Sequence, residues 1–301
     1  MSTIPLATTQ LATATTIIAE IAMALHPILI KQLGINLPTQ LLGRLGIYST
    51  LGLAFSGPND RKFSWGSTSK ALQSILFGFM NLVHIAASYL SYSYLPAGSA
   101  LALYYISPFF NILLGWLFLK DSVSLPILGL MLVAFLGVLL ISKYTKDGDG
   151  KGHDNTEKNQ AHIWYGIAAA LTAAFTESLI FLIARSGEES TPWLPILKLY
   201  PGAFLGILAW IVYSKSSINT EVKNWIPLIL FNTFIGFLGY SLRFWSILRL
   251  PTAIFSILTF IGVAAGYSWG LMYSKEVPSP GALLGAGLIT GAIGLLKYIN
   301  P

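Results

Sequence analysis

The sequence predicts an all-α integral membrane protein with ten transmembrane helices, arranged as two inverted five-helix repeats. Of the 301 residues, 54% are hydrophobic and only 10% are charged, whereas an ordinary soluble domain carries roughly 25% charged residues. The mean hydropathy of +0.67 comes from runs long enough to cross a hydrocarbon core of about 30 Å. The third observation is that landmarks of the first half recur at a constant offset in the second.

The apolar runs are expected to be helical, because a backbone in hydrocarbon must satisfy its own hydrogen bonds and no barrel-like alternation is present. Proline near the start of several runs agrees with this, since the first turn of a helix loses little from a missing N–H. Turns are expected at 56–60 and 214–219. The runs span approximately 11–34, 39–56, 71–94, 97–119, 124–142, 163–185, 193–213, 225–247, 250–273 and 279–298.

Composition excludes several classes of function. The net charge is +6 and the pI is about 9.4, but the basic residues are scattered singly through short loops, so no nucleic-acid partner is expected. Cysteine is absent, which excludes disulfides, thiolate metal sites and cysteine nucleophiles. No GxSxG, HExxH or P-loop motif occurs, so the sequence predicts neither an enzyme nor a cofactor or metal site.

A polar stretch divides the chain. Residues 143–162 are too charged and too rich in glycine to pack, and we expect a flexible linker there. Residues 1–142 and 163–301 then form two domains with five apolar runs each.

The two halves repeat one another. Leu95-Pro96, followed by a run that ends at Lys120-Asp121, recurs 155 residues later as Leu250-Pro251 and Lys275-Glu276. Five spans are an odd number, so the second half enters the membrane from the opposite side. Inverted repeats of this kind are typical of alternating-access transporters, whose site lies between the repeats near the membrane midplane.

These residues also carry a family resemblance. The stretch Leu95–Ala100, with Pro108, Lys120-Asp121, Gly129 and Gly137-Val138, resembles the EamA-type drug/metabolite transporter superfamily. The resemblance implies ten helices in two EamA-like halves and cytoplasmic termini. It also implies a central cavity between helices 1 to 4 and 6 to 9, with helices 5 and 10 peripheral. The chain departs from the pattern where Val263 replaces the counterpart of Pro108.

Polar side chains inside the apolar runs are the candidate solute-binding groups. They fall on single faces of the third, fourth, eighth and ninth runs, where polar groups in lipid need a partner or a purpose. The alternative is helix packing, because small and hydroxyl residues also hold membrane helices together. The candidates are Asn81, His84, Tyr104, Ser107, Asn111, Tyr240, Arg243 and Thr259.

The intramembrane charges allow two interpretations. Glu20 and Glu177 lie near the middle of the first and sixth runs, where a carboxylate can carry a coupling proton or bind a cationic group. The alternative is a structural ion pair with Arg44, Lys198 or Arg243. Lys198 and Arg243 are also candidates for an anion clamp, unless their side chains reach the headgroups instead.

The last run is rich in glycine at small-xxx-small spacings: Gly281, Gly285, Gly287 and Gly291. We expect close helix packing there, either within the chain or across a homodimer.

Together these observations predict a multi-pass membrane protein that moves a small polar metabolite by alternating access, either coupled to protons or as an exchanger. The lack of any ATP-binding motif favours a secondary mechanism. The alternative is a membrane scaffold or sensor that retains the fold without transporting.

Overall fold

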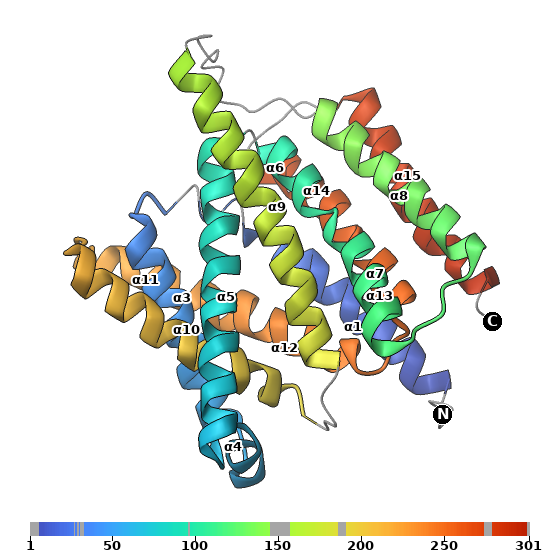
Figure 1. Ribbon diagram of the computed structural model, residues 1–301. Helices are drawn as coiled ribbons and strands as arrows, with labels where there is room; N and C mark the ends of the chain where they lie inside the picture. Colours follow the sequence, from blue (N-terminus) through green and yellow to red (C-terminus); the bar gives the residue numbers. More distant parts are fainter. Residues whose placement is uncertain are drawn as a thin grey trace.

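The computed structural model describes residues 6–26, 28, 30, 33–95, 97–144, 157–185, 191–273 and 279–299. Within these residues the regular structure is entirely helical, so the all-α prediction is confirmed (Figure 1). Described helix falls along each of the ten predicted runs. The count of ten membrane crossings and the inversion of the second half remain predictions.

The first half consists of α1 (Leu6–Met23), α3 (Leu37–Phe55), α4 (Pro58–Trp65), α5 (Thr68–Tyr94), α6 (Ala97–Tyr104), α7 (Ser107–Leu119) and α8 (Leu125–Tyr144). Local chemistry explains several starts. The side chain of Asn36 accepts a hydrogen bond from the Thr39 N–H at the start of α3, and Ser67 caps α5 in the same way.

The turn predicted at 56–60 is wrong, because this segment begins the short helix α4. Pro58 occupies the first turn, where its missing N–H costs nothing, and the Asp60 carboxylate accepts a hydrogen bond of 3.2 Å from the Gly57 N–H. A Gly-Pro pair followed by an acidic residue therefore starts a helix here.

The second half consists of α9 (Glu157–Arg185), α10 (Trp193–Ser214), α11 (Val222–Phe231), the π-helix η1 (Asn232–Phe237), α12 (Leu238–Ile247), α13 (Thr252–Thr259), α14 (Ile261–Tyr273) and α15 (Pro280–Ile299). The segments α11, η1 and α12 follow one another directly. Helix extends into both ends of the expected linker, since α8 continues through Tyr144 and α9 begins at Glu157. Residues 145–156 lie outside the described part.

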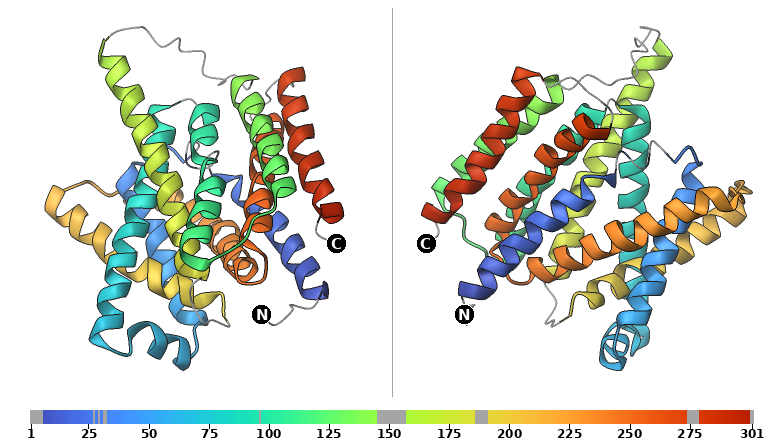
Figure 2. Two further views of the ribbon diagram at one scale, coloured as in Figure 1. Left: turned by 45° about the vertical axis from the view of Figure 1, so that its right-hand side comes forward. Right: turned by 180° about the vertical axis from the view of Figure 1, so that it is seen from behind.

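The halves pack against each other in corresponding pairs. The pair α5–α9 joins the third segment to the sixth, and α1–α12 joins the first to the eighth. Similarly, α6 and α7 pack on α9, while α13 and α14 pack on α1. Figure 2 shows α5 beside α9 and α1 crossing near α12. Each principal contact between the halves thus has a counterpart under exchange of the halves.

The fifth and tenth segments, α8 and α15, form their own pair at one edge of the molecule (Figures 1 and 2). A Cβ on Gly285 would lie 2.5 Å from the Gly137 carbonyl oxygen, so these glycines let the two backbones touch. Gly287 and Gly291 meet nothing within 4 Å among the described atoms. The glycine-rich run therefore packs within the chain at Gly285.

Two segments are broken at equivalent places. The fourth divides into α6 and α7 at Tyr105–Ile106, and the ninth divides into α13 and α14 at Phe260, 155 residues after Tyr105. The rings of Tyr105 and Phe260 contact each other with centroids 6.0 Å apart. Pro108 explains the first break because it removes a helical N–H, but the second occurs with Val263 at the matching position.

The outer surface is apolar. Seven described helical segments are long and apolar enough to cross a membrane. Large hydrophobic side chains lie exposed on them, including Phe118 at 66% and Val212 at 77%. A water-soluble protein rarely exposes so continuous an apolar surface, whereas lipid covers it at no cost.

Candidate functional site

The intramembrane charges meet at one place. The Arg243 guanidinium on α12 lies between two carboxylates, with Nε 3.0 Å from Glu20 Oε1 on α1 and Nη1 hydrogen-bonded to Glu177 Oε1 on α9. All three side chains are at least nine-tenths buried. The sequence left Arg44, Lys198 and Arg243 open as ion-pair partners of these carboxylates. The structure pairs Arg243 with both of them, and one carboxylate comes from each half.

His84 on α5 extends this group. Its Nε2 lies 3.1 Å from Glu177 Oε2, and its Nδ1 lies 3.0 Å from the Ala173 carbonyl oxygen. We refer to Glu20, His84, Glu177 and Arg243 as the central charge cluster. A carbonyl oxygen only accepts, so Nδ1 carries a hydrogen and Nε2 faces the carboxylate. Glu177 Oε2 nevertheless has no hydrogen-bond partner among the described residues, so this contact is one of proximity and charge.

Part of the cluster is left without hydrogen bonds. Arg243 Nε and Glu20 Oε1 are close enough to attract, but their angle does not give a hydrogen bond, and each atom has no other hydrogen-bond partner among the described residues. The Asn111 amide oxygen and the Ser256 hydroxyl are buried and unpaired in the same described set. Unpaired buried polar atoms are costly, and functional sites are one place where they persist.

Arg44 on α3 occupies a second environment, lined by aromatic rings. Its guanidinium carbon lies 5.5 Å from the ring centre of Tyr48 and 5.3 Å from that of Tyr240. Tyr48 stacks on Tyr200 at 4.8 Å, and Tyr240 meets Tyr48 edge-on at 5.8 Å. We call Tyr48, Tyr200 and Tyr240 the tyrosine cage. Arg44 lies near enough to Glu177 to interact electrostatically with it.

Two glycines allow tyrosine hydroxyls to lie directly against helix backbone near the central charge cluster and the tyrosine cage. A Cβ on Gly236 of η1 would collide with the Tyr48 hydroxyl, and a Cβ on Gly262 of α14 would collide with the Tyr105 hydroxyl. That Gly262 Cβ would also lie 3.3 Å from Glu20 Oε2. The π-helical turn of η1 therefore packs directly on the cage, and such turns often occur at functional sites.

The other predicted residues lie around these groups. Tyr104 is half-buried, with its ring centre 6.2 Å from that of His84. Asn81 is buried and donates a 3.3 Å hydrogen bond to the Leu199 carbonyl, which joins α5 to α10. The Ser107 carbonyl accepts from the Ser178 hydroxyl at 3.0 Å. These last two contacts match the helix-packing alternative.

Three further candidates do not join the cluster. Thr259 donates to the Ser256 carbonyl of its own helix at 2.8 Å. Asn111 is buried on α7. Lys198 lies half-buried on α10, whereas both carboxylates of the cluster pair with Arg243.

Polar contacts join the end of α7, the end of α9 and the start of α13. Asp121, after α7, accepts a hydrogen bond from the Thr252 hydroxyl at the start of α13 and lies 3.6 Å from Arg185 Nε at the end of α9. Arg185 Nη1 also donates to the Ile247 carbonyl at 3.1 Å and to the Leu250 carbonyl. We call Asp121, Arg185 and Thr252 the end latch.

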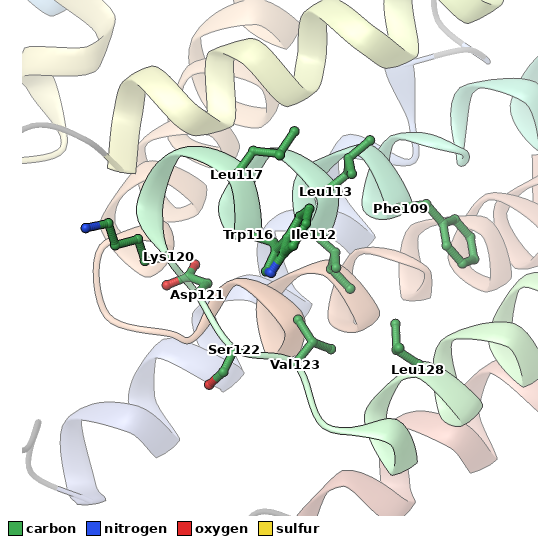
Figure 3. Close-up of a pocket in the computed structure, with 10 residues that line it drawn as sticks. All are labelled: Phe109, Ile112, Leu113, Trp116, Leu117, Lys120, Asp121, Ser122, Val123 and Leu128. Carbon is green, nitrogen blue, oxygen red and sulfur yellow. The ribbon is translucent and has the colours of Figure 1, made fainter.

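A pocket of about 890 Å³ lies between α7, the following residues and α8 (Figure 3). Apart from Lys120, Asp121 and Ser122, its lining is apolar, with Trp116 and Phe109 among the side chains drawn. It lies beside the α8–α15 edge and not at the central charge cluster. This apolar lining does not suit a polar solute, so the candidate site rests on the buried charges. Within the described residues, no group of three His, Asp or Glu side chains is arranged to hold a metal ion.

Sequence reasoning missed Tyr48 and Tyr200. A signal for Tyr48 was present, because a residue four positions after Arg44 shares its helical face. Tyr200 has no comparable signal, since α10 reaches the cage only through tertiary packing.

Comparisons with known proteins agree with this architecture. Residues 10–143 match the EamA-like transporter family. The pseudopaline exporter CntI of Pseudomonas aeruginosa strain UCBPP-PA14 is 22% identical over 215 residues, which cover 71% of each chain. The uncharacterized transporter YxxF of Bacillus subtilis strain 168 is 23% identical over 245 residues, which cover 81% of this chain and 76% of the relative.

A solved crystal structure has the same fold, with a TM-score of 0.72 over 96% of both chains at 12% identity. This likeness extends to nearly all of the chain, whereas the family match is confined to its first half. The relatives point to transport and not to catalysis. The resemblance predicted from the sequence is therefore confirmed: the chain is an integral multi-pass membrane transporter that is similar to the EamA-like transporter family over residues 10–143.

Proposed function

We propose that the protein is a secondary transporter that moves a small polar metabolite by alternating access, with proton coupling at the central charge cluster. The observation that carries this proposal is the position of Arg243, which holds one carboxylate from each half. Any rearrangement of the halves around this point must change these ion pairs. A site of this kind can register both a solute and a proton.

The pairing of segments supports alternating access. Each principal contact of one half has its counterpart under exchange of the halves, as α5–α9 has in α1–α12. The equivalent breaks at Tyr105 and Phe260 follow the same relation. Two packings related by this exchange would have similar contacts and hence similar free energies, which is what a rocking transporter requires.

The closeness of His84 and Glu177 supports the coupling. Because Nδ1 is committed to the Ala173 carbonyl, a proton taken up by this pair would reside on Nε2 of the imidazole or on the carboxylate. Movement of α5 against α9 would separate the two groups and force the proton onto one of them. Release of this proton on one side of the membrane would couple transport to a pH gradient.

Efflux from proteoliposomes tests transport without knowledge of the solute. Vesicles are loaded with a defined mixture of metabolites, and the loss of each compound is followed by mass spectrometry, with and without a pH gradient. We expect at least one compound to leave more than tenfold faster than from protein-free vesicles, and faster with the gradient. If no compound leaves faster, transport is refuted and a scaffold or sensor role is favoured.

Substitutions at the two carboxylates test the coupling. In Glu177→Gln the shared proton site is lost, so we expect the response to the pH gradient to disappear while exchange of solute persists. In Glu20→Gln, where the described ion-pair partner is Arg243 and not a histidine, the gradient response should remain. A full gradient response in Glu177→Gln would exclude this residue as the proton carrier. Leu132→Ala on the lipid-facing surface, where the side chain is 57% exposed, serves as the control.

A further inference from the structure

Arg44 is a buried cation that contacts no carboxylate among the described residues. Only 6% of the residue's surface is exposed. Among the described residues no carboxylate forms an ion pair with it, and its surroundings are tyrosine rings. Arginine remains charged inside proteins, so a negatively charged ligand that reached this site would be stabilised.

The carboxylate that Arg44 senses is already engaged elsewhere. Glu177 lies near enough to Arg44 to interact electrostatically with it, but its Oε1 is hydrogen-bonded to Arg243. Among the described residues Arg44 therefore has no carboxylate in direct contact.

Two unpaired donors accompany this charge. Arg44 Nε and the Tyr48 hydroxyl are both buried and have no hydrogen-bond partner within the described part of the chain. They belong to the same face of α3, four residues apart, and the guanidinium lies against the Tyr48 ring. A ligand that satisfies both must offer acceptors.

The tyrosine cage limits what that ligand can be. Tyr48 on α3 and Tyr240 on α12 contact the guanidinium, Tyr200 on α10 stacks on Tyr48, and the backbone of η1 closes on Tyr48 at Gly236. A carboxylate has two acceptor oxygens, one negative charge and a planar shape that fits the arginine fork. A phosphate monoester brings more charge than Arg44 can neutralise, and a neutral amide leaves the arginine charge unbalanced.

We propose that Arg44 and Tyr48 bind the carboxylate group of the transported solute, with the guanidinium neutralising its charge and the tyrosine cage excluding water. This assignment rests on the proposed transport function, and it specifies the chemistry of the solute. Tyr240 forms one wall of the cage and precedes Arg243 by one helical turn, so occupation of the Arg44 site would be communicated directly to the central charge cluster.

Ligand-dependent thermal stability of the purified full chain in detergent tests the binding step, because a ligand that binds the folded state raises the melting temperature. The probes are three matched mixtures: small carboxylic acids, including hydroxy, keto and amino acids, then their primary amides, and then phosphate monoesters. We expect stabilisation of the unmodified protein by the carboxylates alone. Stabilisation by the amides or phosphate esters, or by no carboxylate, overturns the proposal.

Variants then locate the effect. We expect Arg44→Gln to weaken the apparent affinity for the stabilising carboxylate at least tenfold, Arg44→Lys to weaken it less, and Tyr48→Phe to weaken it several-fold. The matched controls are Arg249→Gln, in the turn after α12, and Tyr213→Phe, at a position that is 90% exposed. Both variants should bind the carboxylate as the unmodified protein does. Unchanged affinity in Arg44→Gln overturns the assignment. If that variant fails to fold, the comparison of acids with amides and the Tyr48→Phe result still decide it.

The efflux assay separates this proposal from the transport function. Binding of carboxylates without efflux refutes transport and leaves the carboxylate site standing. Efflux only of compounds that lack a carboxylate leaves transport standing and refutes the role of Arg44.

Discussion

Arg44 and Arg243 are both buried arginines on helices that face the interior, but their surroundings are opposite. Arg243 lies between Glu20 and Glu177, so the folded chain supplies its counter-charges. Arg44 faces Tyr48 and Tyr240, and the described residues supply no carboxylate. Arg243 thus has its counter-charges within the chain, whereas Arg44 is the residue for which we propose a ligand. The comparison teaches that burial of a charge alone does not reveal its role, whereas its partners do.

The largest expected effect comes from Arg243→Met. Removing this guanidinium strands two buried carboxylates, and loss of one partner of a buried pair costs roughly 3 to 5 kcal/mol. We expect poor yield and a strongly lowered melting temperature. Arg44→Met is the matched control and should be far less harmful in the absence of ligand, because it leaves no carboxylate behind. Equal destabilisation by the two variants would remove the distinction between the arginines.

A smaller difference is expected between Glu177→Gln and Glu20→Gln. Glu177 contacts both Arg243 and His84, while Glu20 contacts Arg243 without a well-formed hydrogen bond. The melting temperature should therefore fall more for Glu177→Gln. If Glu20→Gln proved the more damaging, the central charge cluster would depend on α1 more than its geometry indicates.

Glycine substitutions perturb each environment without changing charge. Gly236→Ala places a Cβ against the Tyr48 hydroxyl, and Gly262→Ala places one against Tyr105 and near Glu20. Overpacking of this kind costs about 1 to 3 kcal/mol. We expect Gly236→Ala to reduce carboxylate binding and Gly262→Ala to lower the melting temperature while leaving the gradient response of efflux in place. Gly129→Ala, which has nothing within 4 Å among the described atoms, should behave like the unmodified protein.

The smallest effect is expected outside both environments. Replacing residues 145–156 by a Gly/Ser chain of equal length should leave efflux within a few-fold, because their composition offers little apolar surface to bury. Efflux rates before and after replacement measure this. Loss of membrane insertion would show that the segment contributes to folding.

The fold was largely predictable because lipid restricts the possibilities. An apolar run of bilayer length must be helical, and described helix follows the predicted runs. The start of α4 was not predicted, because Gly57-Pro58 is compatible with a turn or with a helix start. The break at Phe260 was also hidden, since no proline marks it.

The site was predictable only in part. Glu20, Glu177 and Arg243 stood out because charges are rare in apolar runs, but sequence spacing gives neither helix rotation nor relative depth, so the choice among Arg44, Lys198 and Arg243 stayed open. Geometry makes that choice in favour of Arg243. The partner of His84 depends on contact between α5 and α9, which no local pattern encodes.

The break at Tyr105–Ile106 makes α7 a lever. At 1.5 Å per residue its 13 residues extend about 20 Å from the break. A tilt of about ten degrees at the break therefore displaces the far end by roughly 3 Å, about the width of a water molecule. That far end leads into Asp121, which is bonded to Thr252 and pairs with Arg185. A small rotation beside Tyr105 would thus move the far end of α7 by about the length of the hydrogen bond that joins Asp121 to Thr252 in the end latch.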